Sequence, residues 1–109
     1  MTLFWQSDGR LTEDYHVFVH LLNTEGLLVA QHDGVPVQGE RATWNWRDGE
    51  VLQDEHTLVT GVDLPGGAYV LSVGMYDFLT SARLPALSPT GERLLEDCVF
   101  LEDIQVTLP

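Results

Sequence analysis

The feature that most constrains the fold of this chain is the alternation of its side chains with a period of two. In residues 15–23, Tyr15, Val17, Val19 and Leu21 would fall on one face of an extended segment, and residues 68–76 alternate in the same way. No run keeps apolar residues at the i, i+3, i+4 and i+7 positions long enough to favour a helix. The chain is therefore predicted to be all-β.

Turn residues separate the predicted strands at short intervals. A hairpin turn is predicted at 23–26, where Gly26 can adopt a positive φ, between strands at 15–23 and 27–32. Residues 33–49 are predicted to be a long loop with a short strand or turn around Trp44 to Trp46. Further strands are predicted at 2–7, 50–62, 68–76, 94–101 and 102–108. About seven short strands favour an immunoglobulin-like β-sandwich of antiparallel strands, with a small barrel as the alternative.

The length of the chain, 109 residues, is typical of one domain, so residues 1–109 are predicted to form a single β-sandwich domain. Its first and last predicted strands lie at the two ends of the chain, which suggests a domain cut from a longer protein. No apolar stretch approaches the roughly 18–20 residues of a membrane span, so this segment is not expected to insert into a membrane.

The charge balance is strongly acidic. There are 17 Asp and Glu against 5 basic residues, all of them Arg, for a formal net charge of -12. Such a surface repels polyanions, so nucleic acid is not expected as a partner. Neutral ligands and cations remain compatible with this charge, as does a solvated acidic surface with no partner at all.

The residue types that bind metals are scattered. His16 and His20 share a strand face but lie roughly 13 Å apart along it, too far for one metal ion. His32 could lie opposite either of them across the hairpin, depending on the register. Cys98, the one cysteine, lies in an apolar run and is predicted to be a buried thiol that forms no intrachain disulfide. No metal site is predicted.

No catalytic motif is present. The serines, at positions 7, 72, 81 and 88, do not lie in a Gly-x-Ser-x-Gly turn, and the acidic residues do not follow the pattern of an EF-hand loop. A looser calcium site between loops stays open as an alternative. The chain is predicted not to be an enzyme and to need no cofactor.

The candidate binding residues lie in the irregular loop. Trp44 and Trp46 have the same parity, so in an extended backbone they would face one side, where indole rings can stack on the C–H faces of sugars. Arg47, Asp48 and Glu50 lie nearby and could hydrogen-bond to sugar hydroxyls. The alternative interpretation is that one or both tryptophans close an open end of the core.

Several stretches together resemble a known family. The chain resembles the C-terminal, extracytoplasmic β-sandwich domain of bacterial multi-pass membrane proteins of the glycosyltransferase or mannosyltransferase type. The matching stretches follow one another in order along most of the chain: LFWQ (3–6), YHVFVHLL (15–22), VAQHDG (29–34), WRDGEV (46–51) and LPGGAYVLSVGMYD (64–77).

The resemblance implies a cellular context and no defined activity. It places the domain on the extracytoplasmic side of a bacterial membrane, as part of a larger membrane protein and near glycan substrates. The expected function is a non-catalytic accessory module that binds glycan or packs against its parent membrane protein. The alternative is a structural or protein-interaction domain that uses an exposed sheet edge and binds no small ligand.

Overall fold

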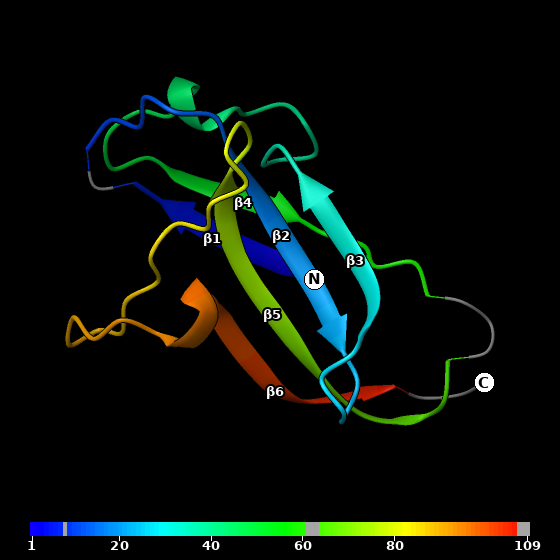
Figure 1. The fold of residues 1–109 in the computed structure, drawn as a ribbon. Coiled ribbons are helices and arrows are strands. Elements are labelled where there is room, and N and C mark those ends of the chain that lie inside the picture. The colour runs from blue at the N-terminus through cyan, green and yellow to red at the C-terminus, as the bar shows by residue number, and fades with distance from the viewer. Residues whose placement is uncertain (8, 61–63, 107–109) are drawn as a thin grey trace.

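The computed structural model describes residues 1–7, 9–60 and 64–106, with only the backbone described for 102–106. These residues form six strands in two antiparallel sheets, which confirms the all-β class (Figure 1). One sheet has two strands in the order β1–β4, and the other has four in the order β3–β2–β5–β6. The strands are β1 (Thr2–Gln6), β2 (Tyr15–Leu22), β3 (Leu28–Gly34), β4 (Val51–Glu55), β5 (Gly67–Asp77) and β6 (Val99–Val106).

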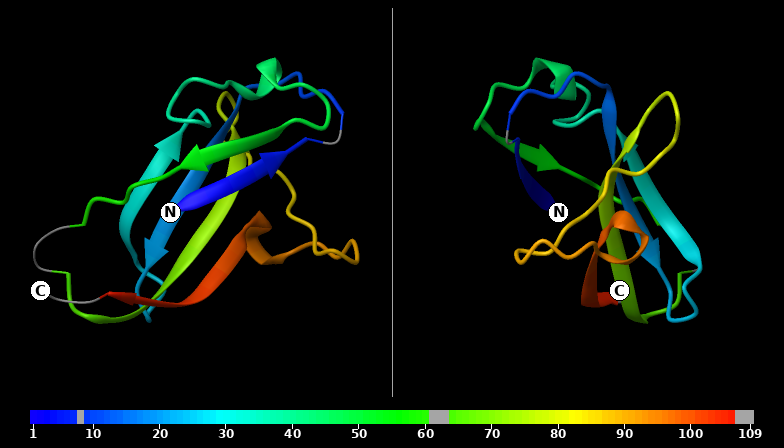
Figure 2. Two further views of the ribbon diagram at one scale, coloured as in Figure 1. Left: turned by 180° about the vertical axis from the view of Figure 1, so that it is seen from behind. Right: turned by 60° about the vertical axis from the view of Figure 1, so that its left-hand side comes forward.

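The two-stranded sheet lies against one face of the four-stranded sheet, so the domain has two layers (Figure 2). Val17 and Val19 of β2 and Val73 of β5 point into the space between the layers, and Leu52 of β4 meets them from the short sheet. Burial of these apolar side chains, at about 25 cal/mol per Å², is what holds the layers together.

The predicted hairpin between β2 and β3 is confirmed. Its turn is built by Asn23, whose Oδ1 accepts hydrogen bonds from the N–H groups of Glu25 and Leu27, both at 2.9 Å. Gly26 has a φ of 80°, a conformation that glycine adopts without steric cost. The hairpin therefore follows from local chemistry that the sequence displays.

The outer face of β2 is also buried. Phe18 is 2% exposed and lies against Gly74, where a Cβ atom would come within 2.6 Å of the ring. The guanidinium of Arg83 lies over the face of the ring, 4.3 Å from its centroid. As the two apolar faces of its sequence predicted, β2 is a central strand, between β3 and β5.

Some strand bounds differ from those expected, and one merger lowers the count from seven to six. The segment around Trp44 is a 3-10 helix, η1 (Thr43–Asn45), and β4 ends at Glu55 instead of running on to residue 62. The two strands expected at 94–101 and 102–108 are one strand, β6, which follows a second short 3-10 helix, η2 (Leu95–Asp97). Residues 61–62 and 107–108 of these predictions lie outside the described part of the chain.

Two further expectations concern Cys98 and membrane spans. Cys98 is 1% exposed, so the buried thiol is confirmed. Within the part of the chain that the structure describes, no helix is long and apolar enough to cross a membrane.

Candidate ligand-binding pocket

The two tryptophans of the predicted site do not share a surface. Trp44 is 56% exposed on the 3-10 helix, whereas Trp46 is 2% exposed and its Nε1–H donates to the carbonyl oxygen of Arg41 at 2.9 Å. Residues of equal parity share a face only in an extended backbone, and here the helical turn Thr43–Asn45 replaces it. Trp46 is a core residue, as the alternative interpretation proposed, and Trp44 alone faces solvent.

The charged members of the predicted site hold the loop together. The guanidinium of Arg41 binds the carboxylate of Glu50 through two hydrogen bonds, at 2.9 and 2.7 Å, and the backbone N–H of Arg47 donates to the same carboxylate. The hydrogen bonds from Arg41 and from the Arg47 backbone lower the pKa of Glu50 to about 2. Asp48 accepts the backbone N–H of Gly9 at 2.8 Å. Glu50 and Asp48 are thus engaged in contacts within the chain.

A different group of polar residues is buried between the sheets. Leu52, Asp54 and His56 alternate along β4 and just beyond it, so all three point inward. Asp54 is 1% exposed, and its Oδ2 accepts the Trp5 Nε1–H at 3.0 Å and lies 2.5 Å from His56 Nε2. Its Oδ1 accepts the backbone N–H of Val37 at 2.7 Å. A buried carboxylate with several hydrogen bonds is well compensated for its lost hydration.

The hydrogen bonds continue from His56 to the neighbouring sheet. His56 Nδ1 lies 2.7 Å from Nδ1 of His32 on β3. With Asp54 as acceptor, His56 Nε2 carries a proton, and the Nδ1 of a neutral His56 then accepts the proton of His32 Nδ1. This arrangement leaves Nε2 of His32 as an acceptor. We call Asp54, His56 and His32 the histidine chain.

The turn after β3 has an unusual backbone. Val37 and Gln38 have φ values of 57° and 54°, in the left-handed region that a β-branched residue such as Val37 rarely adopts. The bond from the Val37 N–H to Asp54 holds this conformation in place, as does the bond from the Gly39 N–H to the Val35 carbonyl oxygen at 3.1 Å. Backbone strain of this kind is concentrated at functional sites.

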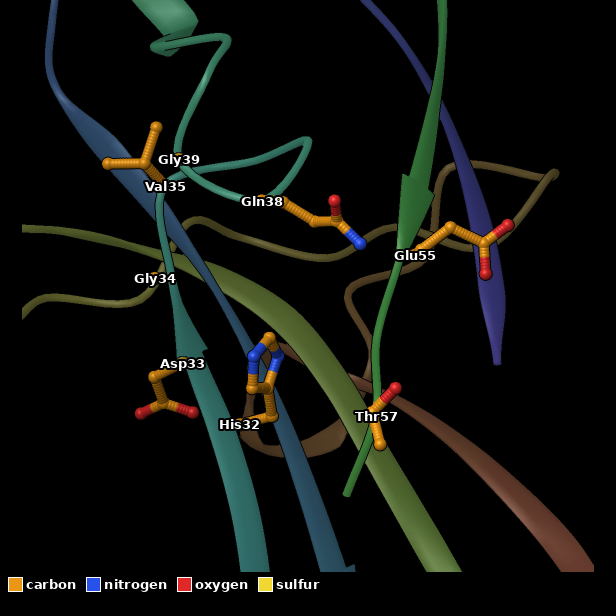
Figure 3. A pocket seen from close by; sticks show the side chains of 8 residues that line it. All are labelled: His32, Asp33, Gly34, Val35, Gln38, Gly39, Glu55 and Thr57. Carbon is orange, nitrogen blue, oxygen red and sulfur yellow. The ribbon is translucent and has the colours of Figure 1, made fainter. Parts of the chain in front are cut away.

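A cavity of about 480 Å³ lies between β3 and β4, next to the histidine chain. This volume falls within the roughly 300–1,000 Å³ of small-molecule sites. The side chains of His32 and Gln38 extend into the space between the two strands, while the carboxylates of Asp33 and Glu55 turn away from it (Figure 3). The cavity is lined by His32, Asp33, Gly34, Val35, Gln38, Gly39, Glu55 and Thr57.

The two carboxylates at the rim have partners elsewhere. Asp33 lies 3.4 Å from His20 on the outer face of the long sheet. Glu55 accepts hydrogen bonds from the side chains of Thr2 and Gln53, and these bonds lower its pKa. Besides these two carboxylates, the polar side chains that line the cavity are those of His32, Gln38 and Thr57, which together supply hydrogen-bond donors and acceptors.

Sequence reasoning missed this pocket. A position of His32 opposite His16 or His20 was left open, depending on the register, whereas the register puts His32 opposite Val19 on the inner face, and His56 reaches it from the other sheet. One local signal was available: Asp54 and His56 share the parity of the apolar Leu52, which marks them as buried polar residues.

The described residues contain no group of three or more His, Cys, Asp or Glu side chains that could hold a metal ion. Comparison with protein-family models, curated proteins and solved structures finds no match to this chain.

Proposed function

We propose that this domain is a non-catalytic, immunoglobulin-like binding module that holds the terminal unit of a neutral glycan in the cavity between β3 and β4. The observation that carries the proposal is the 480 Å³ cavity with the His32 ring and the Gln38 amide extending into it. The packing of two antiparallel sheets supports the immunoglobulin-like part of the proposal.

The chemistry of the cavity favours a neutral, hydroxyl-rich ligand. His32 Nε2 is an acceptor, the Gln38 amide is both donor and acceptor, and the Thr57 hydroxyl is both as well. Sugar hydroxyls also donate and accept, so they can satisfy all three groups. No Arg is among the described residues that line the cavity, and the net charge of the chain is -12, so an anionic ligand is disfavoured.

The histidine chain supports binding in preference to catalysis. Asp54 and His56 are 1% and 5% exposed, so a ligand in the cavity can touch only His32. Their hydrogen bonds fix the orientation of that ring, which reduces the entropy lost on binding. The resemblance supplies the proposed context: an accessory module of a membrane-associated glycosyltransferase-like protein, on the extracytoplasmic side.

The test is a titration of the ¹⁵N-labelled protein with neutral mono- and oligosaccharides, followed by NMR. We expect the largest shifts at His32, Gln38 and Thr57. Thr57→Val removes one hydroxyl, and Gln38→Gly removes the amide while tolerating the left-handed backbone. Each variant should weaken binding by about fivefold, which corresponds to one hydrogen bond of about 1 kcal/mol.

Two control variants decide between the outcomes. Thr60→Val makes the same change outside the cavity lining and should bind as the wild type does. Trp44→Ala removes the exposed indole of the predicted surface. Loss of binding in Trp44→Ala, with Thr57→Val unaffected, would move the glycan site to Trp44 and overturn the assignment to the cavity. Absence of shifts with every sugar would overturn the glycan proposal.

A further inference from the structure

The outer edge of β1 lacks a neighbouring strand within the described part of the chain. The His56 N–H donates to the Met1 carbonyl oxygen at 2.8 Å, and the Gly49 N–H donates to that of Ser7 at 3.2 Å. Residues of odd number therefore direct their backbone groups at β4. In an antiparallel ladder the backbone N–H and C=O groups of the intervening residues point away from the paired strand. The backbone N–H and C=O groups of Thr2, Phe4 and Gln6 thus face the open side.

The sequence of β1, TLFWQ, carries no charged residue or proline that would guard this edge against strand addition. Phe4 is 67% exposed on the outward face of the same strand. The neutrality of β1 is notable in a chain with a net charge of -12.

An apolar groove runs beside the open edge of β1. It has a volume of about 200 Å³, and its walls include Trp5, Val73, Met75, Leu84 and Val99. Among the described residues the short sheet has two strands and the long sheet has four, so none of these strands lies above the inner face of β6 and the groove stays open (Figure 2).

Two side chains on the inner face of β6 are correspondingly exposed. Val99 pairs with Val73 and Leu101 with Leu71. Val73 and Leu71 are 5% and 7% exposed, whereas Val99 and Leu101 are 46% and 38% exposed. A strand added to β1 would lie above β6 and bury both.

The strand orders of the two sheets favour a lone segment over a second copy of this chain at the open edge. If two copies paired through β1, each short sheet would extend over the other copy's long sheet. The β6 strand of one copy would then occupy the space beneath the partner's β1, where the partner's own long sheet lies. A lone extended segment has no such clash. The charge of -12 favours basic residues at its flanks.

We propose that β1 is the docking edge for an extended peptide segment of another protein, with alternating apolar residues and Lys or Arg at its flanks. The segment adds to β1 as a third strand, its backbone pairs with Thr2, Phe4 and Gln6, and its inward side chains cover Val99 and Leu101. This mode of recognition is β-strand addition.

The probe is a synthetic peptide of roughly ten residues with an alternating Thr-Val core and lysines at both ends, the length of an ordinary strand. The control peptide has the same composition with its valines grouped together. The readout is hydrogen exchange of the Phe4 and Gln6 amides together with the methyl signals of Val99 and Leu101. We expect rapid exchange in the isolated protein, at least about tenfold slower exchange with the alternating peptide, and methyl shifts at both β6 residues.

Two variants at Phe4 separate edge pairing from side-chain contact. Phe4→Pro removes an N–H that faces the open side and leaves the ladder to β4 intact, because proline is tolerated at such an edge position. It should abolish peptide binding. Phe4→Thr keeps the N–H and should bind within about twofold of the wild type, because the side chain points away from the groove.

Four outcomes would overturn the proposal. Phe4 and Gln6 amides that are already protected in the free monomer would mean that the chain itself covers the edge. A concentration-dependent dimer that protects them would identify a second copy as the occupant. Equal binding to the wild type and to Phe4→Pro would place the peptide elsewhere. No binding at about millimolar peptide would show that the edge does not accept strands.

Discussion

The short sheet meets the long sheet along two sides that are built from opposite chemistry. On the β3–β4 side, which we call the polar seam, the histidine chain connects the sheets through the 2.7 Å hydrogen bond between His32 and His56, and the 2.5 Å bond to Asp54 holds His56 in place. On the β1–β6 side, the apolar seam, Val99 and Leu101 remain half-exposed beside an apolar groove.

The difference shows how each kind of contact specifies structure. Hydrogen bonds between buried groups are directional, and a displaced strand would leave them unpaired at a high cost, so the polar seam fixes where β4 lies over β3. Apolar contacts have no preferred direction and can be completed by any chain of suitable shape. Trp5 takes part in both seams, since its Nε1 binds Asp54 and its ring lines the groove.

The largest expected effect comes from breaking the polar seam at its centre. Asp54→Ala leaves the Trp5 Nε1–H, the His56 ring and the Val37 N–H without their buried acceptor. We expect the free energy of unfolding to fall by about 3–5 kcal/mol, as measured by urea denaturation. Gln53→Ala, on the outward face of the same strand, should change it by less than about 0.5 kcal/mol. Similar losses in the two variants would refute the importance of the seam.

The next experiment tests whether the two histidines are bonded to each other. His32→Ala and His56→Ala should each lower the free energy of unfolding by about 2 kcal/mol, and the double variant should lose about 1 kcal/mol less than the sum. The shortfall arises because the bond between the two Nδ1 atoms can be lost only once. Strict additivity in the double-mutant cycle would mean that the two rings stabilise the domain independently.

A smaller effect is expected where the two seams share a residue. Trp5→Phe removes the hydrogen bond to Asp54 but keeps an aromatic ring in the groove, and should cost about 1–2 kcal/mol in unfolding free energy. Val99→Thr introduces a hydroxyl of similar size at the apolar seam and should cost less than about 0.5 kcal/mol, because Val99 is 46% exposed. A larger loss of unfolding free energy for Val99→Thr than for Trp5→Phe would mean that the apolar seam contributes more to stability than the hydrogen bond of the polar seam does.

The smallest effect lies outside both seams, at the partly exposed pair of Arg41 and Glu50. The pKa of Glu50 is lowered from 4.5 to about 2 in the folded state, so the pair stabilises the fold fully above pH 4.5 and loses this effect as the pH falls through 2. The difference in urea midpoint between the wild type and Glu50→Gln should be small at neutral pH and vanish near pH 2. A difference that persists at pH 2 would assign it to something other than the ion pair.

Local signals in the sequence were sufficient for most strands and one turn. The alternation in β2 and β5 and the Asn23 turn depend on neighbours in the chain, so a sequence pattern displays them. The break before β6 left no such signal, because it uses Glu96 and Asp97 at φ values of 60° and 50°, which neither residue type demands.

The candidate pocket depends on contacts between distant segments. His32 and His56 come from different sheets, and nothing in either local sequence shows that their rings meet. Trp44 and Trp46 were grouped by a rule for extended chains that does not apply to a 3-10 turn. The parity of Asp54 and His56 with Leu52 indicated that they are buried, but their partners depended on a register that only the folded chain defines.

The pairing of β1 with β4 has a consequence for the order in which the domain folds. Thr2 and Glu55 face each other across that ladder although they lie 53 positions apart, whereas Leu22 meets Leu28 across a single turn. Closing the larger loop carries a greater entropic cost, and pairings between distant segments form slowly. The β2–β3 hairpin is therefore expected to form early. During synthesis β1 leaves the ribosome before β4 and pairs late, because its partner strand follows some fifty residues behind.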